Sequence, residues 1–151
     1  MNNNPHFKWM SVALLEAKEA LKKNEVPIGC VIVFNNKIIA KSHNLVETLN
    51  DATAHAEILC ITSASEYLGE KFLYDTAMYV TVEPCPMCAG AIMLARISYL
   101  YFGAFDSKFG ACGSIINIPE KKEFNHTCKV YGGIRDEECS QIMKKFFSNK
   151  R

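Results

Sequence analysis

The stretch AMYVTVEPCPMCAGAIML (77–94) constrains the fold more than any other part of the chain. AMYVTVE (77–83) is rich in β-branched and aromatic residues, which is typical of a strand. A helix is predicted to follow at once over CPMCAGAIMLARI (85–97), because proline is tolerated in a first helical turn. Cys85 and Cys88 are three residues apart, so both sulfurs should lie on one face of that turn. The chain therefore has to fold so that a strand-to-helix junction presents two thiols together.

Strands and helices alternate along the rest of the chain. Apolar spacing predicts an amphipathic helix over 7–23, and PIGCVIVFNNKIIAKSH (27–43) predicts a β-hairpin with an Asn-Asn turn. The alternation predicts an α/β fold with a mixed sheet, because the first strand pair is a hairpin and later strands are joined by helices. The other predicted elements are a helix over 53–67 with Asp51 and Thr53 as possible N-caps, strands at 97–104 and 125–134, and a helix over 135–147.

Length and composition predict one domain over residues 1–151. The chain is 49% hydrophobic, enough for a single buried core. Neither a secretory signal nor a membrane-spanning stretch is found, so we expect a cytoplasmic protein. The net charge of +1 lacks the broad basic footprint of proteins that bind long nucleic acids, so any such site must be local. The basic residues concentrate in KKFFSNKR (144–151), around two phenylalanines.

Seven cysteines in a reducing compartment argue against a disulfide framework, and the odd count agrees. The close pair Cys85 and Cys88 is better explained by metal binding or catalysis, although a redox pair is an alternative. Scattered cysteines in apolar surroundings usually act as small buried hydrophobes. We predict that role for Cys30, Cys60, Cys112, Cys128 and Cys139.

Zinc is the natural cation for the pair, and the chain offers a third ligand in His55. One His and two Cys leave a coordination position for water, which zinc would activate as a nucleophile. Glu57 could then move the proton of that water. Residues two apart point to opposite sides of an ideal helix, so His55 and Glu57 can cooperate only near a helix end. A His-x-Glu pair also occurs by chance. Its combination with PCxxC, however, is a signature of zinc nucleobase deaminases.

With these motifs in place, the chain resembles the cytidine deaminase-like superfamily, and within it the tRNA-specific adenosine deaminases. The implied fold is three-layered α/β/α with a five-stranded mixed sheet. HAE and PCxxC specify only the superfamily, whereas the loop FGAFDSKFGACGS and the pair NH favour the tRNA branch. The matching stretches are EVPIGCVIV (25–33), Asn44, DATAHAEI (51–58), YVTVEPCPMCAGAI (79–92), RISYLYFGAFDSKFGACGS (96–114) and NH (125–126).

The resemblance implies a role for each matching residue. His55, Cys85 and Cys88 would bind one zinc ion, and Glu57 would be the proton shuttle. Asn44 would hydrogen-bond the flipped base, with the remaining substrate contacts from Ala56 and Pro84, from the pocket-wall residues Glu25, Val26 and Ile28, and from Asp106, Lys108 and Phe147 beside the neighbouring nucleotides. On helical spacing from Met143 alone, Phe147 would instead be a core residue. Phe109 departs from the family, which usually has a small or hydroxyl residue there.

The expected activity is hydrolytic deamination of the wobble adenosine of an arginine tRNA, bound through its anticodon stem-loop by a homodimer. DNA and membranes are not expected partners. Two alternatives stay open. One is deamination of a small molecule such as guanine, cytosine or a nucleotide. The other is a zinc module that binds nucleic acid without catalysis, and the presence of Glu57 argues against it.

Overall fold

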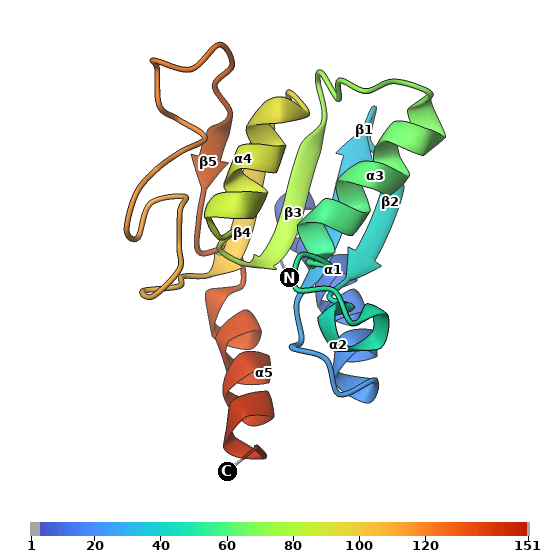
Figure 1. Ribbon diagram of the computed structural model, residues 1–151, viewed down its shortest axis with the longest axis vertical. Helices are drawn as coiled ribbons and strands as arrows, with labels where there is room; N and C mark the ends of the chain where they lie inside the picture. The colour runs from blue at the N-terminus through green and yellow to red at the C-terminus, as the bar shows by residue number, and fades with distance from the viewer. Residues whose placement is uncertain (1–3, 151) are drawn as a thin grey trace.

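A computed structural model describes residues 4–150 of the chain, as five helices and five strands in the order shown in Figure 1. The first helix follows the predicted apolar spacing. Asn4 caps its start, because the Asn4 side chain accepts a hydrogen bond from the backbone N–H of His6. The elements of the described chain are α1 (Pro5–Lys22), β1 (Gly29–Phe34), β2 (Lys37–His43), α2 (Val46–Leu49), α3 (Ala56–Leu68), β3 (Ala77–Val82), α4 (Pro86–Leu94), β4 (Tyr99–Ala104), β5 (Lys129–Tyr131) and α5 (Asp136–Ser148).

The five strands form one mixed sheet in the order β2-β1-β3-β4-β5. Strand β1 runs antiparallel to both β2 and β3, whereas β3, β4 and β5 are parallel to one another. The start of β1 therefore lies at the same edge of the sheet as the ends of β2, β3 and β4 (Figure 1). The five-stranded mixed sheet of the predicted α/β fold is confirmed.

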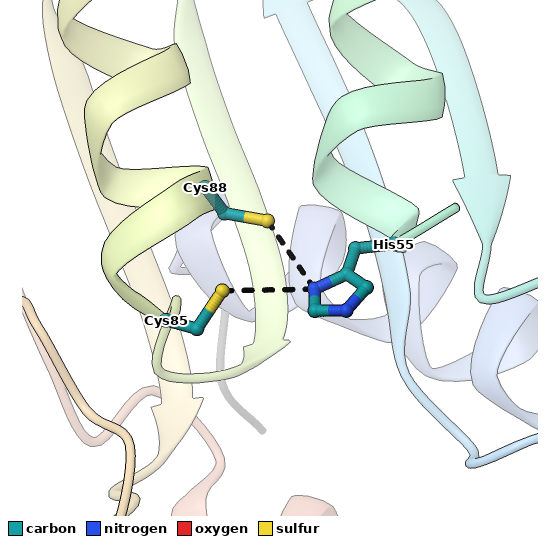
Figure 2. Close-up of side chains that lie close together, drawn as sticks. All are labelled: His55, Cys85 and Cys88. Atoms are coloured by element: carbon teal, nitrogen blue, oxygen red, sulfur yellow. Dashed lines mark hydrogen bonds between the residues drawn. The ribbon is translucent and has the colours of Figure 1, made fainter. Parts of the chain in front are cut away.

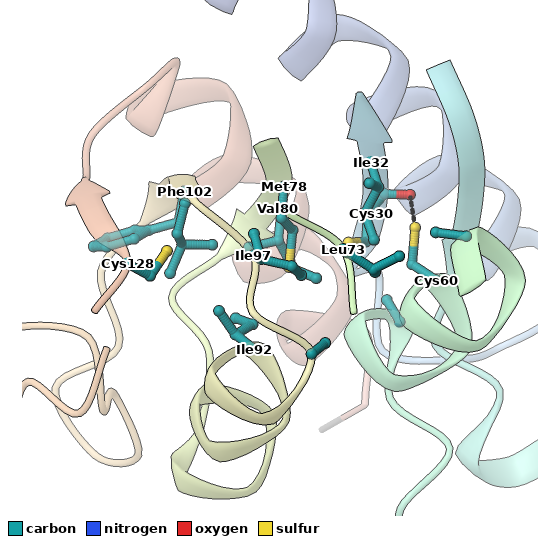
Figure 3. Close-up of a cluster of buried hydrophobic side chains, with 14 of the residues drawn as sticks. Cys30, Ile32, Cys60, Leu73, Met78, Val80, Ile92, Ile97, Phe102 and Cys128 are labelled. Atoms are coloured by element: carbon teal, nitrogen blue, oxygen red, sulfur yellow. Dashed lines mark hydrogen bonds between the residues drawn. The ribbon is translucent and has the colours of Figure 1, made fainter. Parts of the chain in front are cut away.

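Helices cover both faces of the sheet. Helices α3 and α4 lie on one face, where they enclose the larger core of aliphatic and sulfur-containing side chains around Ile32, Met78 and Leu100 (Figures 1 and 3). Helix α1 lies on the other face, over Val31 and Tyr79. Strand β1 is buried on both faces, as its continuous apolar run predicts. The five scattered cysteines are all buried, which agrees with the prediction that they pack as hydrophobes.

Gly29 sets the distance between α1 and the sheet. A Cβ atom at this position would lie 1.9 Å from the carbonyl oxygen of Ala13 and 2.5 Å from the backbone nitrogen of Ala17. Helix α1 therefore packs directly on the backbone of β1, at the edge where the strand begins. Close backbone approach of this kind is one of the few reasons for glycine in a strand.

Two predictions near the second long helix need correction. That helix begins at Ala56 and not at Thr53, and Asp51 does not cap it. Instead, Asp51 Oδ1 accepts hydrogen bonds from the backbone and hydroxyl of Thr53, which makes a local turn. The segment between the predicted hairpin and that helix, for which no element was predicted, contains the one-turn helix α2. Among residues 4–150, no helix is both long and apolar enough to cross a membrane.

Candidate metal centre and active site

His55, Cys85 and Cys88 meet at the ends of two helices (Figure 2). His55 is the N-cap of α3 and Cys85 the N-cap of α4, both with extended backbone, while Cys88 lies one turn into α4. Nδ1 of His55 lies 3.6 Å from Sγ of Cys85 and 3.5 Å from Sγ of Cys88. The three ligand atoms all lie within 4.8 Å of one another.

This geometry fits a tetrahedral zinc ion. Zinc bonds of about 2.3 Å to sulfur and about 2.0 Å to nitrogen place the two kinds of ligand atom about 3.5 Å apart at a tetrahedral angle. Both nitrogen-to-sulfur distances match that value. Three protein ligands are the number found in catalytic zinc sites, which leave the fourth position for water.

The two thiols differ in acidity, because the pKa of Cys85 is lowered and that of Cys88 is raised. The hydrogen bonds with Cys88 and with His55 together lower the pKa of the Cys85 thiol to about 4, although burial acts in the opposite direction. The hydrogen bond between the two thiols, together with burial, raises the pKa of Cys88. The hydrogen bond with Cys85 raises the pKa of His55. The lowered pKa favours the thiolate form of Cys85, and thiolate is the form that binds a metal.

Glu57 lies in the first turn of α3 and is 4% exposed. Burial raises its pKa to about 7, although hydrogen bonding at its own backbone works in the opposite direction. Because His55 is the cap and Glu57 is inside the helix, the 100° rotation of a regular helix does not separate them. Both side chains line the same cavity. The helix-end placement that the sequence requires for cooperation is therefore present.

The cavity beside these four residues has a volume of about 570 Å³. Its walls come from the loop before β1, the loop before α3, the junction of β3 and α4, the loop after β4, and α5. Of the residues predicted from the sequence, it is lined by Val26, Ile28, His55, Glu57, Cys85, Asp106 and Phe147. Ligand cavities commonly have this size, and open α/β sheets carry them at the edge where parallel strands end.

A smaller recess of about 240 Å³ adjoins the same side chains and is lined by Glu25, Asn44 and Ala56 as well. The Asn44 amide donates to the carbonyl oxygen of Val26 at 3.4 Å and accepts from the backbone N–H of Val46 at 3.4 Å. The Glu25 side chain, predicted as a pocket wall, turns toward α2 and accepts three hydrogen bonds there from Glu47 and Thr48. Its carboxylate is thus occupied by the protein.

The residues predicted to contact neighbouring nucleotides lie along a groove of about 540 Å³ between the loop after β4 and α5. Asp106, Lys108 and Phe147 all line it. Phe147 is 51% exposed and Phe146 is buried, so the core role that helical spacing alone gives to Phe147 is wrong. Pro84 lines neither the groove nor the cavity, and its carbonyl oxygen accepts a hydrogen bond from the N–H of Ala111 at 2.9 Å.

Sequence reasoning missed several lining residues. Phe109 is 67% exposed and lines both the cavity and the groove, and Met143 does so from α5. Glu83, which follows β3, was also missed, although an acidic residue that ends an apolar strand run was a usable signal. Val46 and Glu47 line the recess from α2, whose existence the sequence did not indicate.

Comparison with known proteins agrees with this geometry. A family model described as MafB19-like deaminase matches residues 4–151. The chain is 47% identical over 143 residues to a tRNA-specific adenosine deaminase of Bacillus subtilis (strain 168), covering 95% of this chain and 89% of the relative. It is 45% identical over 151 residues to the protein of that name from Agrobacterium fabrum (strain C58 / ATCC 33970), covering 100% and 98%. The chain belongs to the tRNA-specific adenosine deaminase family.

Solved structures support the same assignment. A structure from a study of A-to-I editing by tRNA:A34 deaminases superimposes with a TM-score of 0.86 at 45% identity, covering 89% of this chain and 98% of that one. A guanine deaminase from Nitrosomonas europaea superimposes with a TM-score of 0.80 at 21% identity, covering 94% and 84%, and so shares the fold. As a member of the family, the chain is a deaminase with the cytidine deaminase-like fold, and its His/Cys/Cys group suits a metal.

Proposed function

We propose that this deaminase converts the wobble adenosine of an arginine tRNA to inosine, with one zinc ion per subunit held by His55, Cys85 and Cys88. The observation that carries the proposal is the ligand triad with zinc-like spacing beside the buried Glu57, in the wall of a cavity of about 570 Å³. The relatives named as tRNA-specific adenosine deaminases support the substrate. The bound metal would supply Lewis-acid activation of water.

The chain's own residues would move the protons. Glu57, with its pKa near 7, would take one proton from the attacking water and give it to N1 of adenine. It would then take the second proton, from the hydroxyl newly bound to C6, and give it to the departing amine. Water adds to C6 and the C6–N bond breaks, so that adenosine and water become inosine and ammonia. Asn44, with Val26 and Ile28, would bind the base after it leaves the anticodon stack. Unstacking costs less from a loop than from a duplex.

The groove supports an RNA substrate rather than a free base. Lys108 and Lys144 line it together with the exposed rings of Phe109 and Phe147. Cations beside stacking rings are what a single-stranded backbone with unstacked bases requires. We place the enzyme in the cytoplasm, with the anticodon stem-loop as its partner and with no DNA substrate.

We also propose that the enzyme is a homodimer. Exposed apolar side chains on α4 and in the loop after β4 support this, because a lone subunit would leave them in water: Leu94 is 73% exposed, Ile115 is 56% exposed and Ile116 is 48% exposed. Sedimentation analysis should give twice the subunit mass for the wild type. Charged substitutions at Leu94 and Ile115 should reduce the measured mass to that of one subunit.

The function is tested by incubating the zinc-loaded protein with an arginine tRNA bearing a wobble adenosine, beside free guanine, cytosine, cytidine and adenosine. Inosine is read by sequencing and ammonia by a coupled assay. We expect inosine only at the wobble position, and its loss with Glu57→Gln at unchanged zinc content. Ammonia from a free base and none from tRNA would establish the small-molecule alternative. If no substrate were deaminated, the alternative of a zinc module that binds nucleic acid without catalysis would be favoured.

A further inference from the structure

A second buried carboxylate lies next to the metal ligands and takes no part in the proton transfers above. Glu83 follows β3 directly, two residues before Cys85, and is 3% exposed. Both of its oxygens are occupied by the loop after β4. Oε1 accepts from the N–H of Asp106 at 3.0 Å and from the hydroxyl of Ser114, while Oε2 accepts from the N–H of Cys112 at 3.1 Å and of Ser114 at 2.9 Å.

The sheet brings the carboxylate and the loop together. Strands β3 and β4 are parallel, with Val82 beside Ala104, and the N–H of Glu83 donates to the carbonyl oxygen of Ala104 at 2.8 Å. The loop then folds back over the end of β3. At Gly110 it passes so close that a Cβ atom would lie 2.4 Å from Cδ and Oε2 of Glu83. A glycine is required there by this close approach.

The loop that Glu83 holds also forms a wall of the active site. Asp106 and Phe109 line the cavity beside His55 and Glu57. Asp106 Oδ1 accepts hydrogen bonds from the N–H groups of Lys108 and Phe109, each at 3.0 Å, so the exposed tip is folded around its own carboxylate. The internal turn shapes the tip, and the bonds to Glu83 fix where that tip stands relative to the metal ligands.

We propose that Glu83 is a positioning residue that binds the backbone of loop 105–114 and thereby places the substrate-binding wall of the active site. It acts through the loop and does not touch the reacting atoms. Removing its charge should therefore weaken the binding of RNA while leaving the chemical step largely intact. The proposal rests on the proposed function for its substrate, but the attachment of the loop can be tested independently of any activity.

The test compares zinc-loaded wild type with Glu83→Gln, which keeps the volume of the side chain. The glutamine amide has only one acceptor oxygen, so its NH₂ group must face N–H donors of the loop, and at least one pair of bonds is lost. Ser114→Ala is a milder second variant, because it removes a single hydroxyl from an exposed residue. Glu120→Gln is the matched control, because the Glu120 carboxylate also accepts a hydrogen bond from a backbone N–H, that of Val130 in β5, but lies away from the cavity.

Two readouts decide the proposal. Hydrogen exchange of the peptide 105–114 should be about tenfold or more faster in Glu83→Gln, and intermediate in Ser114→Ala, with the rest of the chain unchanged. The KM for an anticodon stem-loop should rise about tenfold or more, with kcat within about threefold of wild type and zinc content unchanged. Glu120→Gln should match wild type in both.

Other results would overturn it. Unchanged exchange in Glu83→Gln would show that the carboxylate does not hold the loop. Faster exchange with an unchanged KM would show that the loop position does not govern binding, and a fall in kcat alone would make Glu83 part of the proton chemistry. If wild type failed to deaminate RNA, the proposed function would fail, whereas the exchange experiment would still decide whether Glu83 holds the loop.

Discussion

Removing the Glu25 carboxylate should lower the free energy of unfolding by about 3 kcal/mol at neutral pH. Glu25 is fully buried and accepts hydrogen bonds from the N–H of Glu47 at 3.0 Å, and from the N–H and hydroxyl of Thr48 at 2.6 Å each. Hydrogen bonds to charged groups contribute about 1.5 to 3 kcal/mol each. Glu47 and Thr48 are exposed, so water can replace the lost acceptor. We therefore use the lower limit, about 1.5 kcal/mol, for each of the two backbone hydrogen bonds lost in Glu25→Ala, which gives about 3 kcal/mol.

The effect should depend on pH with a defined sign. Burial by itself raises the pKa of Glu25, but the hydrogen bonds from Thr48 and Glu47 outweigh it and hold the pKa below its ordinary value. A group whose pKa is lowered by folding stabilises the fold above its unfolded pKa, about 4.3 for glutamate. That contribution is lost as the pH falls through the lower folded value. The difference between wild type and Glu25→Ala should thus be largest at pH 7 and shrink below about pH 4.

Urea unfolding at several pH values, with identical metal loading, measures this difference. Loss of metal in acid affects both proteins alike and cancels when they are compared at one pH. Glu19→Gln is the control, because Glu19 makes only an exposed ion pair with Lys22 at 3.3 Å and should change stability by less than about 1 kcal/mol. A difference for Glu25→Ala that is below about 1 kcal/mol at pH 7, or equally large at pH 3.5 and pH 7, would refute the reasoning.

Three further predictions test the candidate metal centre, the packing of α1 and the groove. Cys88→Ser should abolish the rise in melting temperature that added zinc gives to wild type, because serine replaces a metal ligand; calorimetry with and without zinc measures it. Gly29→Ala should lower the free energy of unfolding by about 3 kcal/mol in urea, because its Cβ meets the backbone of α1. Phe147→Ala should raise the KM for RNA about tenfold, the value expected for the loss of one base stack, with little loss of stability. The control is Phe146→Ala, which removes a buried ring and should lower the free energy of unfolding in urea by about 3 kcal/mol.

Local patterns in the sequence predicted most of the sheet and the long helices. The hairpin, the buried strand β1 and the strand-to-helix junction at Cys85 depend on neighbours in sequence, and all three are present. Helix α2 could not be predicted in this way. It is one turn long, and the charge that binds its N–H groups belongs to Glu25, more than twenty residues earlier. The same holds for the start of α3, where Asp51 makes a local turn and His55 occupies the cap position.

The residues of the candidate site also differ in how far local sequence patterns predict them. Short spacings and a family resemblance pointed to His55, Glu57, Cys85 and Cys88, because each of the two motifs spans only a few neighbouring residues. The walls of the cavity were less accessible to prediction. Phe109 is exposed and follows no periodic pattern, and the partners of Glu83 lie more than twenty residues away in a loop without regular structure.

The residues proposed for the chemistry and those proposed for substrate binding therefore belong to different segments of the chain. The candidate metal ligands are fixed by the starts of α3 and α4, and thus by the sheet on which these helices pack. The walls are segments after β2 and β4, each held by one buried glutamate, Glu25 or Glu83. A change in either wall can alter which base fits without moving a metal ligand. A guanine deaminase with only 21% identity shares the fold at a TM-score of 0.80. Differences in substrate between such proteins should therefore be sought first in these two walls and in the carboxylates that hold them.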